Sequence, residues 1–314
     1  MIYYKEKEKR IGMNIGQTLY YFRKNRKLKQ REILDYSSSS IYSKIESNRQ
    51  EIKLDELVYF LKKTEITIEE FFEYMDLDNE QEIFRKIFKK SSQNVNDLYL
   101  KKQVCSFDFD WSDVNHKTLQ ELSNYVVIHL FFSKYWSDIN PLSEKQIEYI
   151  YELLSSKSAY FQYDYILLAN TIFLFDDNQA DYLFKKIFPV TKNKVCSSTT
   201  KSFISSIMNN IITKSLRDKQ YSNAKFYISV AKNQEERIND IGYKIIINYL
   251  ENLTNHMITG KYIYLEKVYD CIKLLKDIRE VELANSIELE VESLTVKEGY
   301  FPKTATNTMY INID

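Results

Sequence analysis

Apolar residues recur at every third or fourth position along most of this 314-residue chain. From residue 80 onward they form segments of roughly 12 to 22 residues, separated by polar or proline-marked turns. Shorter segments with the same period lie between residues 15 and 74. Five glycines and three prolines are too few for a chain of strands and tight turns. The pattern therefore predicts an all-α protein.

The N-terminal segments predict a helix-turn-helix unit over residues 13–75. They read IGQTLYYFRKNRKLKQREILDY, SSSSIYSKIESNRQ and KLDELVYFLKKTEITIEEFF. Such a unit buries one face of its recognition helix and leaves that helix's N-terminal end free to enter a DNA major groove. The remaining residues, 80–314, form a second predicted domain.

The first predicted helix carries Ile15, Leu19 and Phe22 at helical spacing, with Tyr20 beside them. This puts basic residues on or near the outer side, and we expect Arg23 to be the strongest phosphate contact. The alternative is that these basic side chains are solvated charges on an amphipathic helix. The outer basic residues are Arg23, Lys24, Arg26 and Lys27.

The second predicted helix starts near Leu28, and the third starts within the serine run 37–40. A serine hydroxyl accepts a hydrogen bond from the free amides of a first helical turn, so this run supplies an N-cap. An ordinary capped helix remains an alternative, and Tyr42 and Ile45 are core anchors in either case. Gln30 can meet a phosphate or brace the next helix. The DNA-contact candidates are Arg23, Lys24, Lys27, Gln30, Ser39, Ser40, Ile41 and Lys44.

Charge is distributed unevenly along the chain. The formal net charge is zero, but residues 13–49 hold eight basic against three acidic residues, a net of +5. Binding to DNA phosphates needs a basic surface only where the phosphates lie, and an acidic remainder discourages nonspecific coating. The asymmetry favours a DNA-binding N-terminal unit.

The C-terminal segments predict stacked helix pairs of the tetratricopeptide repeat (TPR) type. Tyr221, Ala224, Tyr227 and Ala231 place aromatic and small residues as in the second helix of such a repeat. Weaker copies are expected at Ala180 with Phe184, and at Tyr262 with Tyr269. We therefore expect a TPR-like α-solenoid.

Stacked helix pairs curve, and the first helix of each pair lines a groove that suits an extended peptide. Asparagine can both donate to and accept from a peptide backbone, and aromatic rings can wall an apolar groove. Asparagine is also abundant in this chain, so a purely structural role is the alternative. The peptide-contact candidates are Asn170, Asn209, Asn210, Asn248, Asn252, Tyr165, Phe173, Phe203 and Tyr249.

Other classes of protein find little support in the sequence. Three cysteines are odd in number and widely spaced, which favours reduced thiols over disulfides or a metal site. Glycine-rich phosphate loops and common hydrolase motifs are absent, and the three histidines are far apart, so we expect no enzyme, cofactor or metal. No apolar run is long enough for a membrane span, which favours the cytoplasm. Residues 1–12 suggest a disordered leader, with Met13 as an alternative start.

The N-terminal unit resembles the Rgg family of peptide-pheromone receptors, within the RRNPP group. The matching stretches are IGQTLYYFRKNRK, SKIESNRQEI and ELVYFLKKTEITIEEFF. Arg23 matches the family's first-helix arginine, and residues 43–46 match its Ser-Arg-Phe-Glu run. Two departures occur, because Ser47 and Asn48 stand where Arg-Gly is usual and the preceding turn is about one residue shorter. The resemblance covers about a fifth of the chain and also implies that groove asparagines hold peptide backbone.

We therefore expect a cytoplasmic transcription regulator of the quorum-sensing type, which binds double-stranded DNA as a homodimer and responds to a short hydrophobic peptide. Two alternatives remain open. One is a TPR-like peptide- or protein-binding module with a degenerate helix-turn-helix, suggested by the shortened turn and the missing glycine. The other is a repressor that answers to no peptide.

Overall fold

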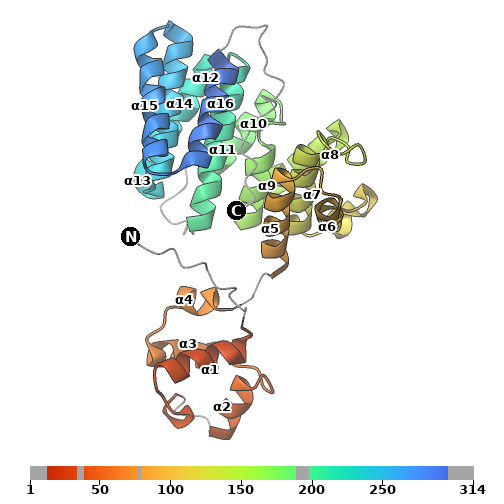
Figure 1. Cartoon of the computed structure of the whole chain (residues 1–314), viewed down its shortest axis with the longest axis vertical. Helices are drawn as coiled ribbons and strands as arrows, with labels where there is room; N and C mark the ends of the chain where they lie inside the picture. Colours follow the sequence, from red (N-terminus) through yellow and green to blue (C-terminus); the bar gives the residue numbers. More distant parts are fainter. Residues whose placement is uncertain (1–12, 34–38, 76–78, 189–197, 296–314) are drawn as a thin grey trace. The chain divides into compact units, whose positions relative to one another are not determined.

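A computed structural model describes residues 13–33, 39–75, 79–188 and 198–295 of the chain. Apart from a single bridge between Met13 and Met75, the regular structure of these residues is helical, which confirms the all-α fold (Figure 1). The chain divides into two compact units, residues 1–83 and 84–314. The predicted leader (1–12) and Leu34 lie outside the described residues.

The N-terminal unit contains α1 (Ile15–Asn25), the short 3-10 helix η1 (Gln30–Glu32), α2 (Ser39–Glu46), α3 (Leu54–Thr64) and α4 (Ile68–Glu73). Helix α2 begins within the serine run, where the sequence predicts a helix start. Its inward side chains Tyr42 and Ile45 are fully buried, as expected. They pack with Leu19 and Phe22 of α1 and with Phe60 of α3 in one core. The second predicted helix is represented among the described residues by η1 alone.

The packing of α1 on α2 depends on Gly16. A Cβ atom at this position would lie 2.6 Å from the carbonyl oxygens of Ile45 and Glu46. In the turn after α2, Asn48 has a left-handed backbone, φ 55°, and its Oδ1 accepts from the Gly16 amide at 3.0 Å. Asparagine tolerates this conformation better than most residues. Asn48 therefore provides the backbone turn that a glycine would provide, and it also ties α2 to the start of α1.

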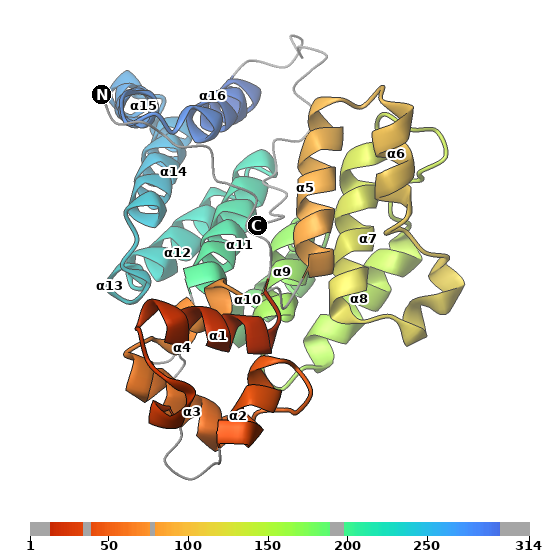
Figure 2. The same cartoon turned by 60° about the horizontal axis from the view of Figure 1, so that its bottom comes forward.

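The C-terminal unit contains the remaining helices, of which the first, α5, begins just before the boundary at residue 84. Their bounds are α5 (Asn79–Gln93), α6 (Leu98–Cys105), the 3-10 helix η2 (Trp111–His116), α7 (Leu119–Phe132), α8 (Glu144–Ser156), α9 (Gln162–Thr171), α10 (Asp177–Ile187), α11 (Ser198–Arg217), α12 (Tyr221–Lys232), α13 (Glu235–Ile238), α14 (Ile241–Thr259), α15 (Tyr262–Asp277) and α16 (Val281–Thr295). Helix α5 lies beside α7 (Figure 2), and the rings of Phe88 and Phe132 are 5.2 Å apart.

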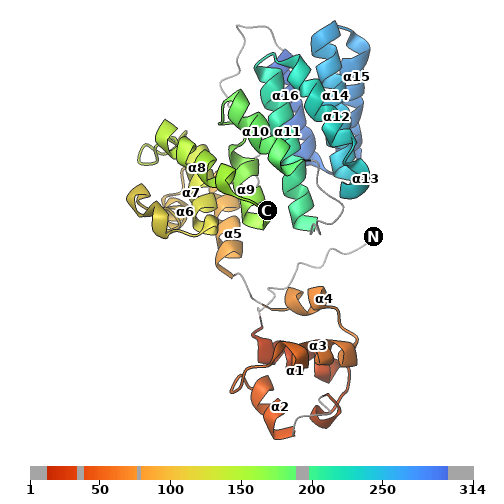
Figure 3. The same cartoon turned by 180° about the vertical axis from the view of Figure 1, so that it is seen from behind.

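These helices stack as a repeat. Helices α7, α9, α11 and α14 pack one against the next, while α8, α12 and α15 each pack beside a member of that row. Helix α16 packs on α15, and α14 to α16 form one end of the stack (Figure 3). One large core of leucine, isoleucine and aromatic residues runs through this row. The predicted TPR-like stack is therefore confirmed.

The residues predicted to form the repeat pattern are buried in two helices and exposed in a third. Ala224, Tyr227 and Ala231 are buried in α12, and Ala180 with Phe184 are buried in α10, as the second-helix pattern predicts. The copy proposed in α15 is wrong, because Tyr262 and Tyr269 are exposed and this helix buries Val268, Ile272 and Leu275 instead. Among the described residues, no helix combines the length and apolar character that a bilayer crossing requires.

Candidate functional sites

Arg23 is an internal brace of the N-terminal unit. Its side chain is 5% exposed and forms a two-pronged ion pair with Glu46 of α2, Nε to Oε1 at 2.5 Å and Nη2 to Oε2 at 2.8 Å. Nη1 also donates to the Leu28 carbonyl oxygen at 2.9 Å. The expectation that Arg23 contacts phosphate is therefore wrong, because its guanidinium is buried and paired with a carboxylate.

Gln30 takes the second of the two roles that the sequence allowed. Its Nε2 donates to Glu46 Oε2 at 2.8 Å, so Gln30 braces α2 from the preceding turn. Glu46 thus ties both Arg23 and Gln30 to α2. This arrangement fixes the orientation of α2 within the unit.

The outward face of α2 is polar and accessible. Ser40, Ser43, Lys44 and Ser47 are exposed and follow i, i+3, i+4, i+7 spacing, so they share one side of the helix. Ile41 is half-buried, and the Ser39 side chain lies outside the described atoms. Ser43 and Ser47 were not among the predicted contacts, although their helical spacing with Ser40 and Lys44 carried the signal.

Exposed basic residues lie near this helix in the sequence. Lys24 lies in the last turn of α1 and Lys27 follows the helix, and both are exposed, as are Arg31 and Arg49. The Arg49 amide donates to the Lys44 carbonyl oxygen at 2.8 Å, so this arginine directly follows the end of α2. The described N-terminal unit therefore offers exposed cations without Arg23.

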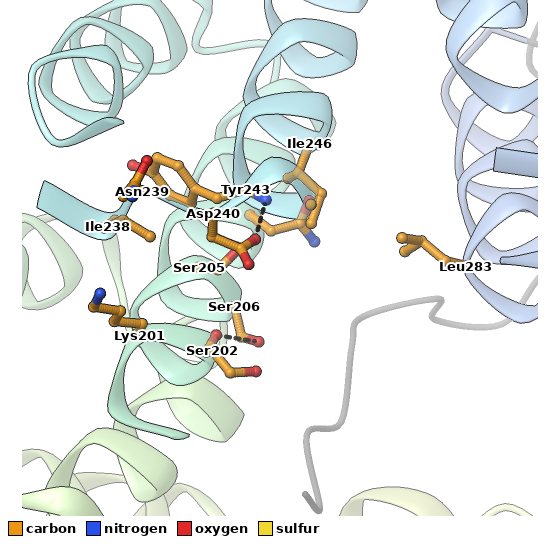
Figure 4. A pocket seen from close by; sticks show the side chains of 12 residues that line it. Lys201, Ser202, Ser205, Ser206, Ile238, Asn239, Asp240, Tyr243, Ile246 and Leu283 are labelled. Atoms are coloured by element: carbon orange, nitrogen blue, oxygen red, sulfur yellow. Dashed lines mark hydrogen bonds between the residues drawn. The ribbon is translucent and has the colours of Figure 1, made fainter. Parts of the chain in front are cut away.

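The C-terminal unit contains a pocket of about 460 Å³ between α11, the start of α14 and α16 (Figure 4). Helix α11 contributes a polar stripe, and the remaining wall mixes apolar side chains with the α14 N-cap. The lining residues are Lys201, Ser202, Ser205, Ser206, Asn209, Ile238, Asn239, Asp240, Gly242, Tyr243, Ile246 and Leu283. The spacing of the α11 residues is helical, so this stripe was readable in the sequence but was missed.

Charge and polarity differ across the pocket. Lys201 has no hydrogen-bond or ion-pair partner among the described residues. Asp240 caps α14 by accepting from the Tyr243 amide at 2.7 Å, as the dashed line in Figure 4 marks. Ile246 and Leu283 supply apolar surface. The pocket therefore suits a small amphipathic ligand with both hydrogen-bonding and apolar groups.

Only one of the predicted peptide-contact asparagines, Asn209, lines this pocket. Asn170 and Asn210 are fully buried, and Asn210 Nδ2 donates to the Ala169 carbonyl oxygen at 2.8 Å, which fastens α11 to α9. Asn252 is buried and donates to the Asn248 carbonyl oxygen of its own helix at 2.8 Å. The burial of Asn170, Asn210 and Asn252 favours the structural alternative for these three residues. Asn248 is exposed but does not line the pocket.

The predicted aromatic walls are core residues. Tyr165, Phe203 and Tyr249 are at most 1% exposed, which removes their rings from contact with a ligand. Phe173 is half-buried and lies outside the pocket lining. The aromatic residue that does line the pocket, Tyr243, was not among the predicted contacts.

A buried polar cluster lies behind Asn209 and was also missed. Glu290 of α16 is fully buried, and its Oε1 accepts from Thr213 Oγ1 at 2.5 Å. The Tyr249 hydroxyl lies 3.0 Å from Glu290 Oε2 and 2.9 Å from Asn209 Oδ1. Burial raises the pKa of the Glu290 carboxyl, although the Thr213 bond, the charge of Arg217 and the Tyr249 bond oppose the shift. The sequence signal was a glutamate on the apolar face that Ile287 and Val291 define.

The solved structures that resemble this chain share its fold. No protein-family model matches the chain, and no curated protein matches it. The PrgX/cCF10 complex matches with a TM-score of 0.76 at 18% identity, over 92% of this chain and 94% of that one. The pheromone receptor Rgg2 of Streptococcus dysgalactiae matches with a TM-score of 0.69 at 19% identity, over 89% and 99%. The chain therefore has the fold of these receptors, and the expected likeness to Rgg proteins is confirmed for the fold.

Proposed function

We propose that this protein is a DNA-binding transcription regulator whose C-terminal repeat binds a short hydrophobic peptide and couples that binding to promoter occupancy. The observation that carries the proposal is the likeness in fold, over about nine-tenths of the chain, to PrgX bound to cCF10 and to a pheromone receptor. The proposal includes a cytoplasmic location and a homodimer, since DNA readers of this kind pair to contact two half-sites.

The DNA-binding half is supported by the geometry of α2. Arg23 and Gln30 hold Glu46, and this leaves the opposite side of the helix, with Ser40 and Lys44, in contact with solvent. A helix whose inner side is fixed and whose outer side carries hydroxyl and ammonium groups suits a DNA groove. We propose Lys24, Lys27, Ser39, Ser40, Ile41 and Lys44 as the contact set.

The interaction-module alternative loses one of its two supports. It was suggested partly by the glycine missing from the turn after α2. Asn48 holds the left-handed conformation there and bonds the Gly16 amide, so the turn is intact without glycine. This favours a working helix-turn-helix over a degenerate one.

The peptide-binding half is supported by the pocket between α11, α14 and α16. Its polar stripe can bond a peptide backbone, and Ile246 and Leu283 can receive an apolar side chain. A peptide changes promoter occupancy only if it binds one arrangement of the dimer better than another, by a few kcal/mol.

Fluorescence anisotropy with DNA from upstream of the protein's own gene tests the first half. We expect the Lys24→Ala/Lys44→Ala double variant to bind at least about tenfold more weakly at moderate salt, because phosphate contacts dominate affinity. The matched control is Lys62→Ala/Lys63→Ala, which removes two exposed lysines of α3 and leaves binding unchanged. Circular dichroism verifies that both variants are folded.

Failure of the wild-type protein to bind any such DNA contradicts the proposal. Equal affinities of the two double variants contradict the assigned surface. Calorimetric titration with short apolar peptides decides whether the regulator binds a peptide or is a peptide-independent repressor.

A further inference from the structure

Asn209 connects the pocket to the protein interior. It lines the pocket although its side chain is only 2% exposed. Its Oδ1 faces the Tyr249 hydroxyl at 2.9 Å, and no described residue accepts a hydrogen bond from its Nδ2. An amide N–H at the wall of a pocket, without an acceptor among the described residues, is a group that a ligand can satisfy.

Which way the Asn209 amide is turned depends on whether Glu290 carries a proton. Tyr249 has a single hydroxyl proton, yet its oxygen lies within hydrogen-bond distance of both Asn209 Oδ1 and Glu290 Oε2. If Glu290 is a neutral acid, its proton bonds to the Tyr249 oxygen, and Tyr249 donates to Asn209 Oδ1. If Glu290 is a carboxylate, Tyr249 donates to Glu290, and Asn209 must turn its Nδ2 toward Tyr249.

The surroundings of Glu290 favour the neutral acid. The side chain is fully buried, and Thr213 of α11 and Tyr249 of α14 contact its two oxygens. The charge of Arg217, also on α11, acts on it in the opposite direction to burial. An ion without a directly bonded counter-ion in such a site is costly, so the group keeps its proton.

We propose that Glu290 is a positioning residue that acts as a neutral acid and, through Tyr249, fixes the Asn209 amide so that its N–H points into the pocket. This deepens the proposed function and rests on it. The ligand then presents a hydrogen-bond acceptor to Asn209 Nδ2. For a peptide this acceptor is a backbone carbonyl oxygen, while Leu283, on the same helix as Glu290, contacts an apolar side chain.

The protonation state can be measured without a ligand. An infrared difference spectrum of the full-length wild type minus Glu290→Gln at neutral pH is expected to contain the carbonyl band of a protonated carboxylic acid. A carboxylate band in its place overturns the proposal.

Binding measurements test whether Glu290 positions Asn209 through Tyr249. The probe is the tightest binder that wild-type protein captures from a mixture of free-acid octapeptides built from Leu, Ile, Val, Phe, Gly and Thr, identified by mass spectrometry. We expect Tyr249→Phe to weaken its binding by roughly fivefold, since one hydrogen bond that fixes Asn209 is lost. Glu290→Gln keeps affinity within about twofold, because a glutamine amide donates to Tyr249 and accepts from Thr213 as the neutral acid does.

Tyr160→Phe is the matched control. It removes a buried hydroxyl that donates to the Leu154 carbonyl oxygen at 2.6 Å, away from the pocket, and leaves binding unchanged. The proposal is overturned if Tyr249→Phe binds as wild type, if Glu290→Gln loses as much affinity as Tyr249→Phe, or if Tyr160→Phe weakens binding equally. If wild-type protein captures no peptide, the proposed function itself fails, and the inference falls with it.

Discussion

Some charged residues of this protein are buried and hold helices together, and their positions in the sequence do not indicate this. Arg23 falls on a basic stretch of an amphipathic helix, where charges usually face water. Its partner Glu46 is 23 residues away, and helical periodicity carries no information on such a pair. The same limit applies to Glu290 and Tyr249, which are 41 residues apart. Residue-level burial of charge was therefore beyond prediction, although exposed positions such as Lys24 and Lys44 were predictable.

Replacing Arg23 with alanine is expected to destabilise the N-terminal unit by about 3–5 kcal/mol, because Glu46 is left buried without its counter-ion. Urea unfolding followed by circular dichroism measures the loss. A matched Arg31→Ala variant, which removes an exposed arginine, is expected to unfold within about 0.5 kcal/mol of wild type. An Arg23→Ala protein as stable as wild type would show that the ion pair is dispensable.

Glu290 gives the unfolding free energy a defined dependence on pH. Its pKa is raised by burial in the folded protein above the ordinary value of 4.5, so the folded state holds the proton that the unfolded chain releases. The stabilisation from this group is complete below about pH 4 and declines by up to about 1.4 kcal/mol per pH unit as pH rises from the unfolded toward the folded pKa. Glu290→Gln has no such proton.

We therefore expect the stability of Glu290→Gln relative to wild type to increase between about pH 5 and pH 7. Urea titrations of both proteins across this range measure the difference. A constant difference would mean that the Glu290 pKa is the same in the folded and unfolded states.

Helices were the most predictable level of the structure. Apolar spacing identified α2, α10 and α12, because their buried stripes are narrow and bounded by polar residues. It failed for α15, where two apolar stripes compete and the aromatic one, with Tyr262 and Tyr269, faces outward. The spacing of a stripe predicts a helix but cannot say which of two stripes the neighbouring helix covers.

The close approach of α1 and α2 makes Gly16 sensitive to substitution. Gly16→Ala is expected to destabilise the protein by about 1–3 kcal/mol, since its methyl group would lie 2.6 Å from two backbone oxygens of α2. Thermal unfolding measures the effect. The control is Gly242→Ala in α14, where the nearest atom is Asp240 Oδ1 at 3.1 Å and alanine's helix propensity offsets the contact. Equal melting temperatures of the two variants would contradict the packing argument.

The whole molecule combines a neutral total charge with a basic N-terminal segment. Its two units have separate hydrophobic cores, one built around Phe60 and the other around the α9 and α11 helices. Separate cores allow the surface charge of one unit to change without altering the packing of the other. The sequence predicted the TPR-like helical stack, whereas among its peptide-contact candidates only Asn209 lines the pocket.

Salt should act on DNA binding through the N-terminal unit alone. A plot of the logarithm of the association constant against the logarithm of salt concentration is expected to become shallower by about two in the Lys24→Ala/Lys44→Ala variant, one for each phosphate contact removed. Anisotropy titrations at several salt concentrations provide the slopes. An unchanged slope would place the DNA backbone elsewhere on the protein.

The contribution of Leu283 from α16 has a consequence for biosynthesis. Helices α11 and α14 leave the ribosome before α16 does, so a nascent chain has two walls of the pocket before it has the third. A premature stop before residue 281 would therefore leave the pocket without Leu283, while the N-terminal unit remains complete.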